Sequence, residues 1–80
     1  MEWAIGTVVY ALCGRDCGKA MCVVGKSETR VFVCDGKERR LQKPKPKNPK
    51  HIRKTEHTLT EAQMRSDRAI KQALKSFSEV

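Results

Sequence analysis

The chain has 80 residues, which leaves room for one domain with a short appended segment and no more. Its net charge of +8 comes from one stretch, because residues 37–54 hold nine Lys and Arg against a single Glu, whereas residues 1–36 and 55–80 are each balanced. Positive charge concentrated in this way attracts polyanions. No apolar run reaches the length of a signal peptide or a membrane span, so we expect a cytoplasmic protein without a membrane partner.

The first forty residues have the pattern of short antiparallel strands. Val-rich segments alternate with turn residues such as those at 14–18, and Asp35-Gly36 is a strong hairpin signal. We expect strands at residues 5–12, 19–24, 30–34 and 37–41, the last short and charged, as suits the edge of a sheet. Several short strands with frequent turns indicate a small barrel or sandwich.

Residues 43–50 contain three prolines alternating with lysines. Each proline removes a backbone donor and favours extended geometry, so this segment cannot be helical and could only edge a sheet. We expect a stiff basic arm over residues 43–57, outside the core, whose lysines lose little chain entropy when they meet a phosphate chain.

The last part of the chain, residues 58–80, is predicted to be a helix. Thr58 with Glu61, or Thr60 with Gln63, fits a capping box. The apolar residues recur at helical spacing and are Ala62, Ala69, Ile70, Ala73, Leu74 and Phe77. We expect this stripe to pack on the β domain rather than to bind a partner.

The four cysteines, at positions 13, 17, 22 and 34, have no tight Cys-x-x-Cys pair of the kind that structural zinc sites use. We therefore expect no metal, and we expect the cysteines in strands to behave as small apolar residues. Cys17 differs, since it lies in a turn between Asp16 and Gly18 and is expected to be an exposed thiol. Metal binding or redox sensing by Cys13, Cys17 and Cys22 is the weaker alternative.

The ordered motifs of the chain suggest a family. The segment Gly-Arg-Asp-Cys-Gly-Lys at residues 14–19, between two predicted strands, resembles the KOW motif of ribosomal and transcription-elongation proteins. Asp-Gly-Lys-x-Arg at 35–39, Pro-Lys-x-Lys at 44–47 and His-Ile at 51–52 extend the resemblance to L14e-type ribosomal proteins and related short bacterial KOW proteins. The resemblance covers roughly residues 4–53 and implies an SH3-like β-barrel that binds RNA, commonly ribosomal RNA, without catalysis.

The expected fold is therefore mainly β: a small SH3-like KOW barrel over residues 1–42, the basic Pro-rich arm over 43–57, and a C-terminal α-helix over 58–80 packed on the barrel.

The physical chemistry of the KOW-like turn agrees with such a role. Gly14 and Gly18 allow a tight turn and leave room for a nucleic-acid backbone, while Arg15 and Lys19 flank the turn and can reach phosphates. We expect Asp16 to hydrogen-bond backbone amides within the turn. Position 17 is often basic in such proteins and is Cys here, which lowers the charge of the turn.

The residues expected to contact RNA share positive charge or lie beside it. They are Arg15, Lys19, Lys37, Arg39, Arg40, Lys43, Lys45, Lys47, Lys50, His51, Arg53 and Lys54. Trp3 and Tyr10 are expected in the core, so contacts should position structured RNA through phosphates rather than stack on bases.

The leading hypothesis is a monomeric, non-catalytic protein that binds ribosomal or other structured RNA, with no cofactor, no metal and no small-molecule substrate. No helix-turn-helix or zinc-finger pattern favours duplex DNA, and no catalytic constellation is visible. The alternative is an SH3-like protein-interaction module whose basic tract meets an acidic protein partner.

Overall fold

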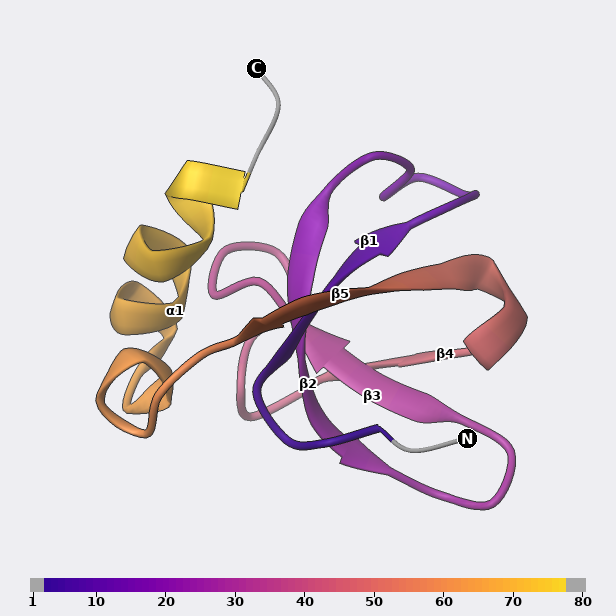
Figure 1. The fold of residues 1–80 in the computed structure, drawn as a ribbon, viewed down its shortest axis with the longest axis horizontal. Helices are drawn as coiled ribbons and strands as arrows, with labels where there is room; N and C mark the ends of the chain where they lie inside the picture. The colour runs from indigo at the N-terminus through magenta and orange to yellow at the C-terminus, as the bar shows by residue number, and fades with distance from the viewer. Residues whose placement is uncertain (1–2, 78–80) are drawn as a thin grey trace.

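The Val-rich segments between residues 7 and 34 form the centre of a five-stranded antiparallel sheet in the computed structural model, which describes residues 3–77 (Figure 1). The strands are β1 (Thr7–Ala11), β2 (Ala20–Lys26), β3 (Val31–Cys34), β4 (Lys45–Lys47) and β5 (Ile52–Thr58). Their spatial order is β4-β3-β2-β1-β5. The protein is thus mainly β, as predicted, with one short helix, α1 (Asp67–Leu74).

Both faces of the sheet are buried, which explains the nearly unbroken apolar runs in β1 and β2. On one face, Val9, Met21 and Val33 pack with Trp3 and Ile52. The opposite face presents a second apolar cluster that α1 covers. Trp3 is buried, as predicted, and therefore belongs to the core.

The two edges of the sheet are formed by consecutive strands. β4 and β5 lie at opposite edges, yet only Asn48 and the 3₁₀ turn η1 (Pro49–His51) separate them in the chain. Such a connection spans at most about 17 Å, whereas four strand spacings in a flat sheet take about 19 Å. The sheet must therefore curl, although no pairing of β4 with β5 closes it within the part of the chain that the structure describes.

The prediction of a basic arm outside the core is wrong for the residues of β4 and β5, which are strands of the sheet, although β4 lies at the sheet edge, as its prolines allow. β4 pairs with β3, and Pro46 lies opposite Phe32 on the sheet edge, the one place in a sheet where a missing backbone donor is tolerated. β5 pairs with β1. Its sequence lacks apolar alternation because, after Ile52, its side chains are exposed or half-buried.

The predicted fourth strand at residues 37–41 is also wrong. Asp35 follows β3 directly, and its Oδ1 accepts hydrogen bonds from the backbone N–H groups of Lys37, Glu38 and Arg39, at 2.9, 3.1 and 2.9 Å. The carboxylate thereby turns the backbone away from the sheet. Lys37, Arg39 and Arg40 consequently lie on a loop between β3 and β4.

The predicted C-terminal helix is shorter than expected. Thr60 and Gln63 form the reciprocal capping box, but it opens only the 3₁₀ turn η2 (Ala62–Met64). The alternative box at Thr58 does not form, since Thr58 ends β5. Ser66 then caps α1 through its hydroxyl, which accepts from the Ala69 N–H.

The apolar stripe of the helix packs on the sheet, as predicted. Ile70 and Leu74 are buried in the second cluster, with Ala73 and Phe77 against it, whereas Ala62 is exposed. A 3₁₀ turn, η3 (Lys75–Phe77), follows α1, and the expected helix beyond it lies outside the described residues. Figure 1 shows α1 beside the end of the sheet that β5 leads to. Across residues 3–77, no helix combines the length and apolar character that crossing a membrane requires.

Candidate functional site

The connection between β1 and β2 is a tight turn that exposes its backbone. Gly14 and Gly18 both have a φ of +84°, a left-handed conformation that favours glycine. A Cβ atom built at either position would meet nothing within 4 Å. The backbone N–H of Cys17 donates to the Gly14 carbonyl at 3.2 Å, which closes the turn. The turn therefore presents open glycine backbone, as predicted.

Asp16 lies beneath this turn as a buried counter-charge, with 2% of its side chain exposed. The guanidinium of Arg39 donates to Oδ2 from Nε and Nη2, at 3.3 and 3.2 Å. The ammonium of Lys47 lies 3.5 Å from the same oxygen, and that of Lys19 lies 3.9 Å from Oδ1. The prediction that Asp16 binds backbone amides is wrong, because its carboxylate pairs with cations from three segments.

The electrostatics of Asp16 favour its charged form. Burial by itself raises the pKa of the carboxyl, but the hydrogen bonds and positive charge of Arg39, with the charge of Lys47, outweigh burial and lower the pKa below its usual value. Asp16 therefore stays ionised and neutralises part of the positive charge of Arg39 and Lys47. Those two side chains are held in place rather than free to follow a ligand.

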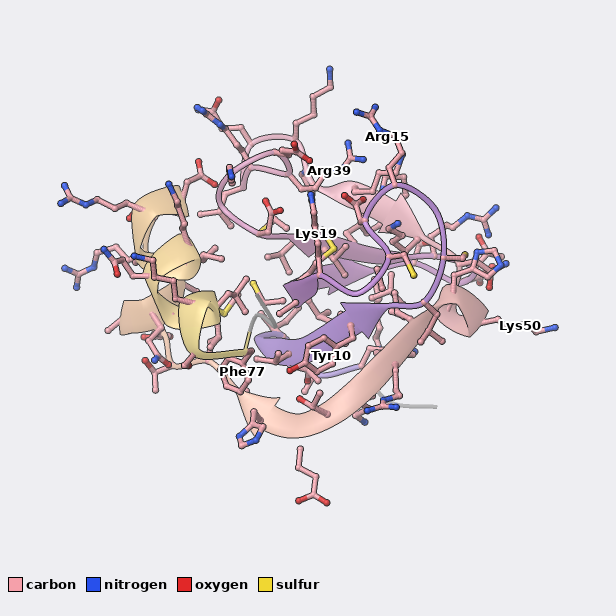
Figure 2. All side chains as sticks on the ribbon, turned by 90° about the horizontal axis from the view of Figure 1, so that it is seen from above. Tyr10, Arg15, Lys19, Arg39, Lys50 and Phe77 are labelled. Atoms are coloured by element: carbon pink, nitrogen blue, oxygen red, sulfur yellow. The ribbon has the colours of Figure 1, made fainter. Side chains whose placement is uncertain are left out.

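An open hollow lies beside the turn, and we call it the turn hollow. Its basic lining residues come from the β1–β2 turn, the residue before β3, the β3–β4 loop, and the segment from β4 to η1: Arg15, Arg30, Arg39, Lys45, Lys47 and His51. Among the described residues that line it, Asp16 alone is acidic. Figure 2 shows Arg15 projecting outward from the turn. Since Asp16 pairs with Arg39 and Lys47, the positive charge available to a ligand in the turn hollow comes mainly from Arg15, Arg30 and Lys45.

The structure divides the twelve predicted contact residues into four groups by location. Lys19, Arg39 and Lys47 surround Asp16. The turn hollow contains Arg15, Lys45 and His51. The β3–β4 connection carries Lys37, Arg40 and Lys43. The last group lies on η1 and β5 and comprises Lys50, Arg53 and Lys54.

These groups lie around several adjoining hollows. Arg40 and Lys43 share a hollow with Lys45, so they continue the turn hollow. Lys50 instead projects away from the sheet (Figure 2), and the ammonium of Lys54 lies 5.9 Å from the centre of the Trp3 ring. The end of the basic segment nevertheless stays close to the turn hollow, because Arg30 lines both that hollow and one with Lys50, and Arg53 lines a hollow with Cys17 and Gly18.

Arg30 was missed by the sequence analysis. It precedes β3 in a part of the chain with no net charge, and only the pairing of β3 with β4 brings it beside Lys47 and Asn48. The signal that could have found Arg30 is the pairing of residues 30–34 with a basic edge strand. That strand was predicted at residues 37–41, whereas the structure has it at β4.

The cysteines divide into an inner and an outer pair. Cys22 and Cys34 face each other across β2 and β3 with their sulfur atoms 3.9 Å apart, and both are buried, as expected for apolar strand residues. The hydrogen bond with Cys22, together with burial, raises the pKa of the Cys34 thiol, which therefore stays neutral. Cys13 and Cys17 are exposed, as predicted for Cys17. Within residues 3–77, no group of three or more His, Cys, Asp and Glu side chains is placed to hold a metal ion.

Tyr10 is half-buried against the helix-covered cluster, and its hydroxyl donates to the Phe77 carbonyl at 2.8 Å (Figure 2). This bond occupies the polar end of the ring. Trp3 is buried and therefore offers no free aromatic face of the kind that stacks on bases, whereas Tyr10 also lines a hollow with Gly18 and Arg53.

In comparisons with known proteins, no family model matches the chain, and no curated protein matches it.

Proposed function

We propose that this chain is a non-catalytic RNA-binding protein with an SH3-like KOW barrel, which contacts ribosomal or other structured RNA mainly through phosphate groups. The observation that carries the proposal is the convergence of Arg15, Arg30, Lys45 and His51 on one open hollow beside an exposed glycine turn. These residues come from three separate segments, so the concentration of charge in the folded protein exceeds what the basic segment alone would produce.

The curl of the sheet supports the barrel. Two strands that are neighbours in sequence lie at opposite sheet edges, and the single 3₁₀ turn between them requires those edges to approach each other. The β1–β2 turn, where the KOW resemblance falls, lies beside this connection, because Asn48 and His51 line the same hollow as Arg15.

The chemistry of the turn hollow suits a phosphodiester chain. Arg15 can donate two parallel hydrogen bonds to one phosphate, while Lys45 supplies a point charge. The open space at Gly14 and Gly18 lets a sugar-phosphate backbone approach the protein backbone closely. Since Trp3 is in the core and Tyr10 is half-buried against the helix-covered cluster, RNA would be positioned mainly by its backbone rather than recognised by base stacking.

The test is the salt dependence of binding to ribosomal RNA fragments. If about six basic groups meet phosphates, log affinity should fall with log salt concentration with a slope of roughly −4 to −5. The double variant R15A/K45A should reduce the steepness of the slope by roughly 1–2. Lys47 is left unchanged because its ammonium pairs with Asp16, so its loss would disturb the fold.

The matched control is R65A/R68A, which removes the same charge from exposed residues around the start of α1. A flat salt response of the unaltered protein, or equal weakening by both double variants, would contradict the proposal. Pull-down from cell extract with and without ribonuclease adds a second criterion. Partners that survive ribonuclease and include no ribosomal proteins would favour an interaction module for an acidic protein instead.

A further inference from the structure

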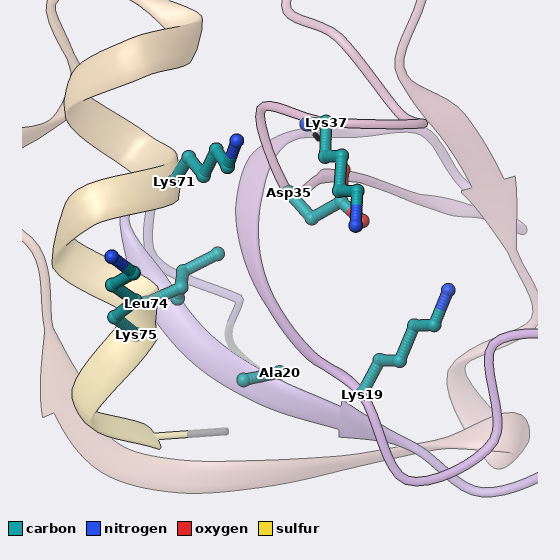
Figure 3. A pocket seen from close by; sticks show the side chains of 7 residues that line it. All are labelled: Lys19, Ala20, Asp35, Lys37, Lys71, Leu74 and Lys75. Atoms are coloured by element: carbon teal, nitrogen blue, oxygen red, sulfur yellow. Dashed lines mark hydrogen bonds between the residues drawn. The ribbon is translucent and has the colours of Figure 1, made fainter. Parts of the chain in front are cut away.

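A second basic hollow lies between the C-terminal helix and the loops that precede β2 and follow β3 (Figure 3), and we call it the helix hollow. Ala20 and Leu74 supply its apolar lining. The basic residues around it are Lys19, Lys37, Lys71 and Lys75. Figure 3 shows Lys71 pointing from α1 toward the loop that carries Lys37. In the helix hollow, Lys71 and Lys75 of the nearly neutral C-terminal segment thus lie near Lys37 of the basic segment.

The charge of the helix hollow is only weakly balanced. Asp35 is the one acidic residue among the described residues that line it, and its Oδ1 already accepts three backbone hydrogen bonds within its own loop. Lys19 pairs with Glu38 at 3.2 Å. Across residues 3–77, no ion pair engages the ammonium groups of Lys37, Lys71 and Lys75. Like charges gathered without partners repel one another, and a bound anion relieves that repulsion.

The two sides of the helix hollow are held together by backbone contacts. A Cβ atom at Gly36 would lie 2.1 Å from the carbonyl oxygen of Asp67, so only glycine lets the loop approach the start of α1 this closely. The Asp67 carboxylate also accepts a hydrogen bond from the Leu41 N–H at 2.7 Å. These contacts fix the loop against the helix, which lowers the entropy that a ligand held by both sides would cost.

The helix hollow and the turn hollow are linked by an ion pair between their lining residues Lys19 and Asp16. Lys19 lines the helix hollow, and its ammonium lies 3.9 Å from the carboxylate of Asp16, which lines the turn hollow. We propose that the helix hollow is a second phosphate site, so that RNA bound at the turn hollow continues across Lys19 and meets Lys71 and Lys75. This inference rests on the proposed RNA-binding function and adds the C-terminal helix to the interface.

The experiment compares K71A/K75A with R65A/R68A in binding to the same ribosomal RNA fragments. Both variants remove two positive charges from exposed residues of the C-terminal segment, but only the first takes them from the helix hollow. Because Ala favours helix, both should keep the circular dichroism of the unaltered protein. K71A/K75A should lower the affinity on the order of tenfold at 0.1 M salt and reduce the salt slope by roughly 1–2. R65A/R68A should change neither quantity appreciably, and K71R/K75R should retain binding.

The outcomes separate this inference from the proposed function. Absence of RNA binding by the unaltered protein would overturn both. If R15A/K45A weakens binding while K71A/K75A behaves as R65A/R68A does, the helix hollow is not a phosphate site, and the proposed function stands. If K71A/K75A leaves RNA affinity unchanged but abolishes binding to polyglutamate, the helix hollow serves an acidic protein, and the inference is wrong.

Discussion

Replacing Asp16 with Asn removes a buried charge from the centre of the site and leaves the shape of the side chain nearly unchanged. The partners of Asp16, Arg39 and Lys47, have only 25% and 11% of their side chains exposed, so water cannot fully replace the lost carboxylate. Removing one member of a buried ion pair costs about 3–5 kcal/mol. Since Arg39 is partly exposed and the Asn oxygen can still accept a hydrogen bond, we expect a loss of about 2–3 kcal/mol in the free energy of unfolding.

The same carboxylate makes stability depend on pH. Burial raises the pKa of Asp16, yet Arg39 and Lys47 lower it more, so the pKa in the folded protein lies below the value of 3.8 for an unperturbed side chain. A carboxyl of this kind contributes stability above its unfolded pKa, and that stability is lost as pH falls through the folded pKa. The stability difference between the unaltered protein and D16N should therefore be complete near pH 7 and shrink below about pH 4.

Urea unfolding followed by circular dichroism, repeated across this pH range, measures both effects. The matched control is Glu28→Gln, which changes the net charge equally but at an exposed side chain in the β2–β3 turn. It should alter stability by no more than about 0.5 kcal/mol. Equal urea midpoints for D16N and E28Q at pH 7 would refute the argument that Asp16 is a buried counter-charge.

Two further changes test the packing around the site. Gly36→Ala should destabilise the protein much more than Gly14→Ala, because both glycines have positive φ but only Gly36 lies against the Asp67 carbonyl. Gly14→Ala should cost about 1–2 kcal/mol from backbone strain alone; equal melting temperatures for these variants would contradict the predicted clash. Tyr10→Phe removes the hydrogen bond to the Phe77 carbonyl and should cost about 0.5–1.5 kcal/mol, measured by thermal unfolding. An unchanged melting temperature would mean that this bond does not hold η3 to the sheet.

The central strands were predictable because their strand conformation follows from the local sequence. β1, β2 and β3 are rich in Val, are bounded by polar or glycine-containing turns and are largely buried, so pattern and burial agree. β4 and β5 could not be predicted in the same way. The Lys-Pro-Lys of β4 and the polar sequence of β5 have little strand character, and both are strands because β3 and β1 offer unpaired backbone groups at the edges.

The candidate site also combines features that follow from neighbouring residues with features that depend on long-range pairing. Arg15, the open glycines and the exposed Cys17 follow from turn chemistry, which depends on neighbours in sequence. The role of Asp16 does not, since its partners Arg39 and Lys47 lie more than twenty residues away and reach it only after the sheet forms.

By itself, the sequence determined the β character of the chain, the glycine turn between the first two strands and the amount of positive charge. Local backbone preference and composition decide these properties. Only the tertiary structure decided which positively charged side chains are available to a ligand. Sheet pairing brings Arg39 and Lys47 to Asp16, which neutralises part of their charge and holds them in place, and it brings Arg30 to Arg15. Packing of α1 places Lys71 opposite Lys37. The physical reason is that electrostatic interaction depends on distance and burial in space, and these are set by long-range pairing rather than by position in the chain.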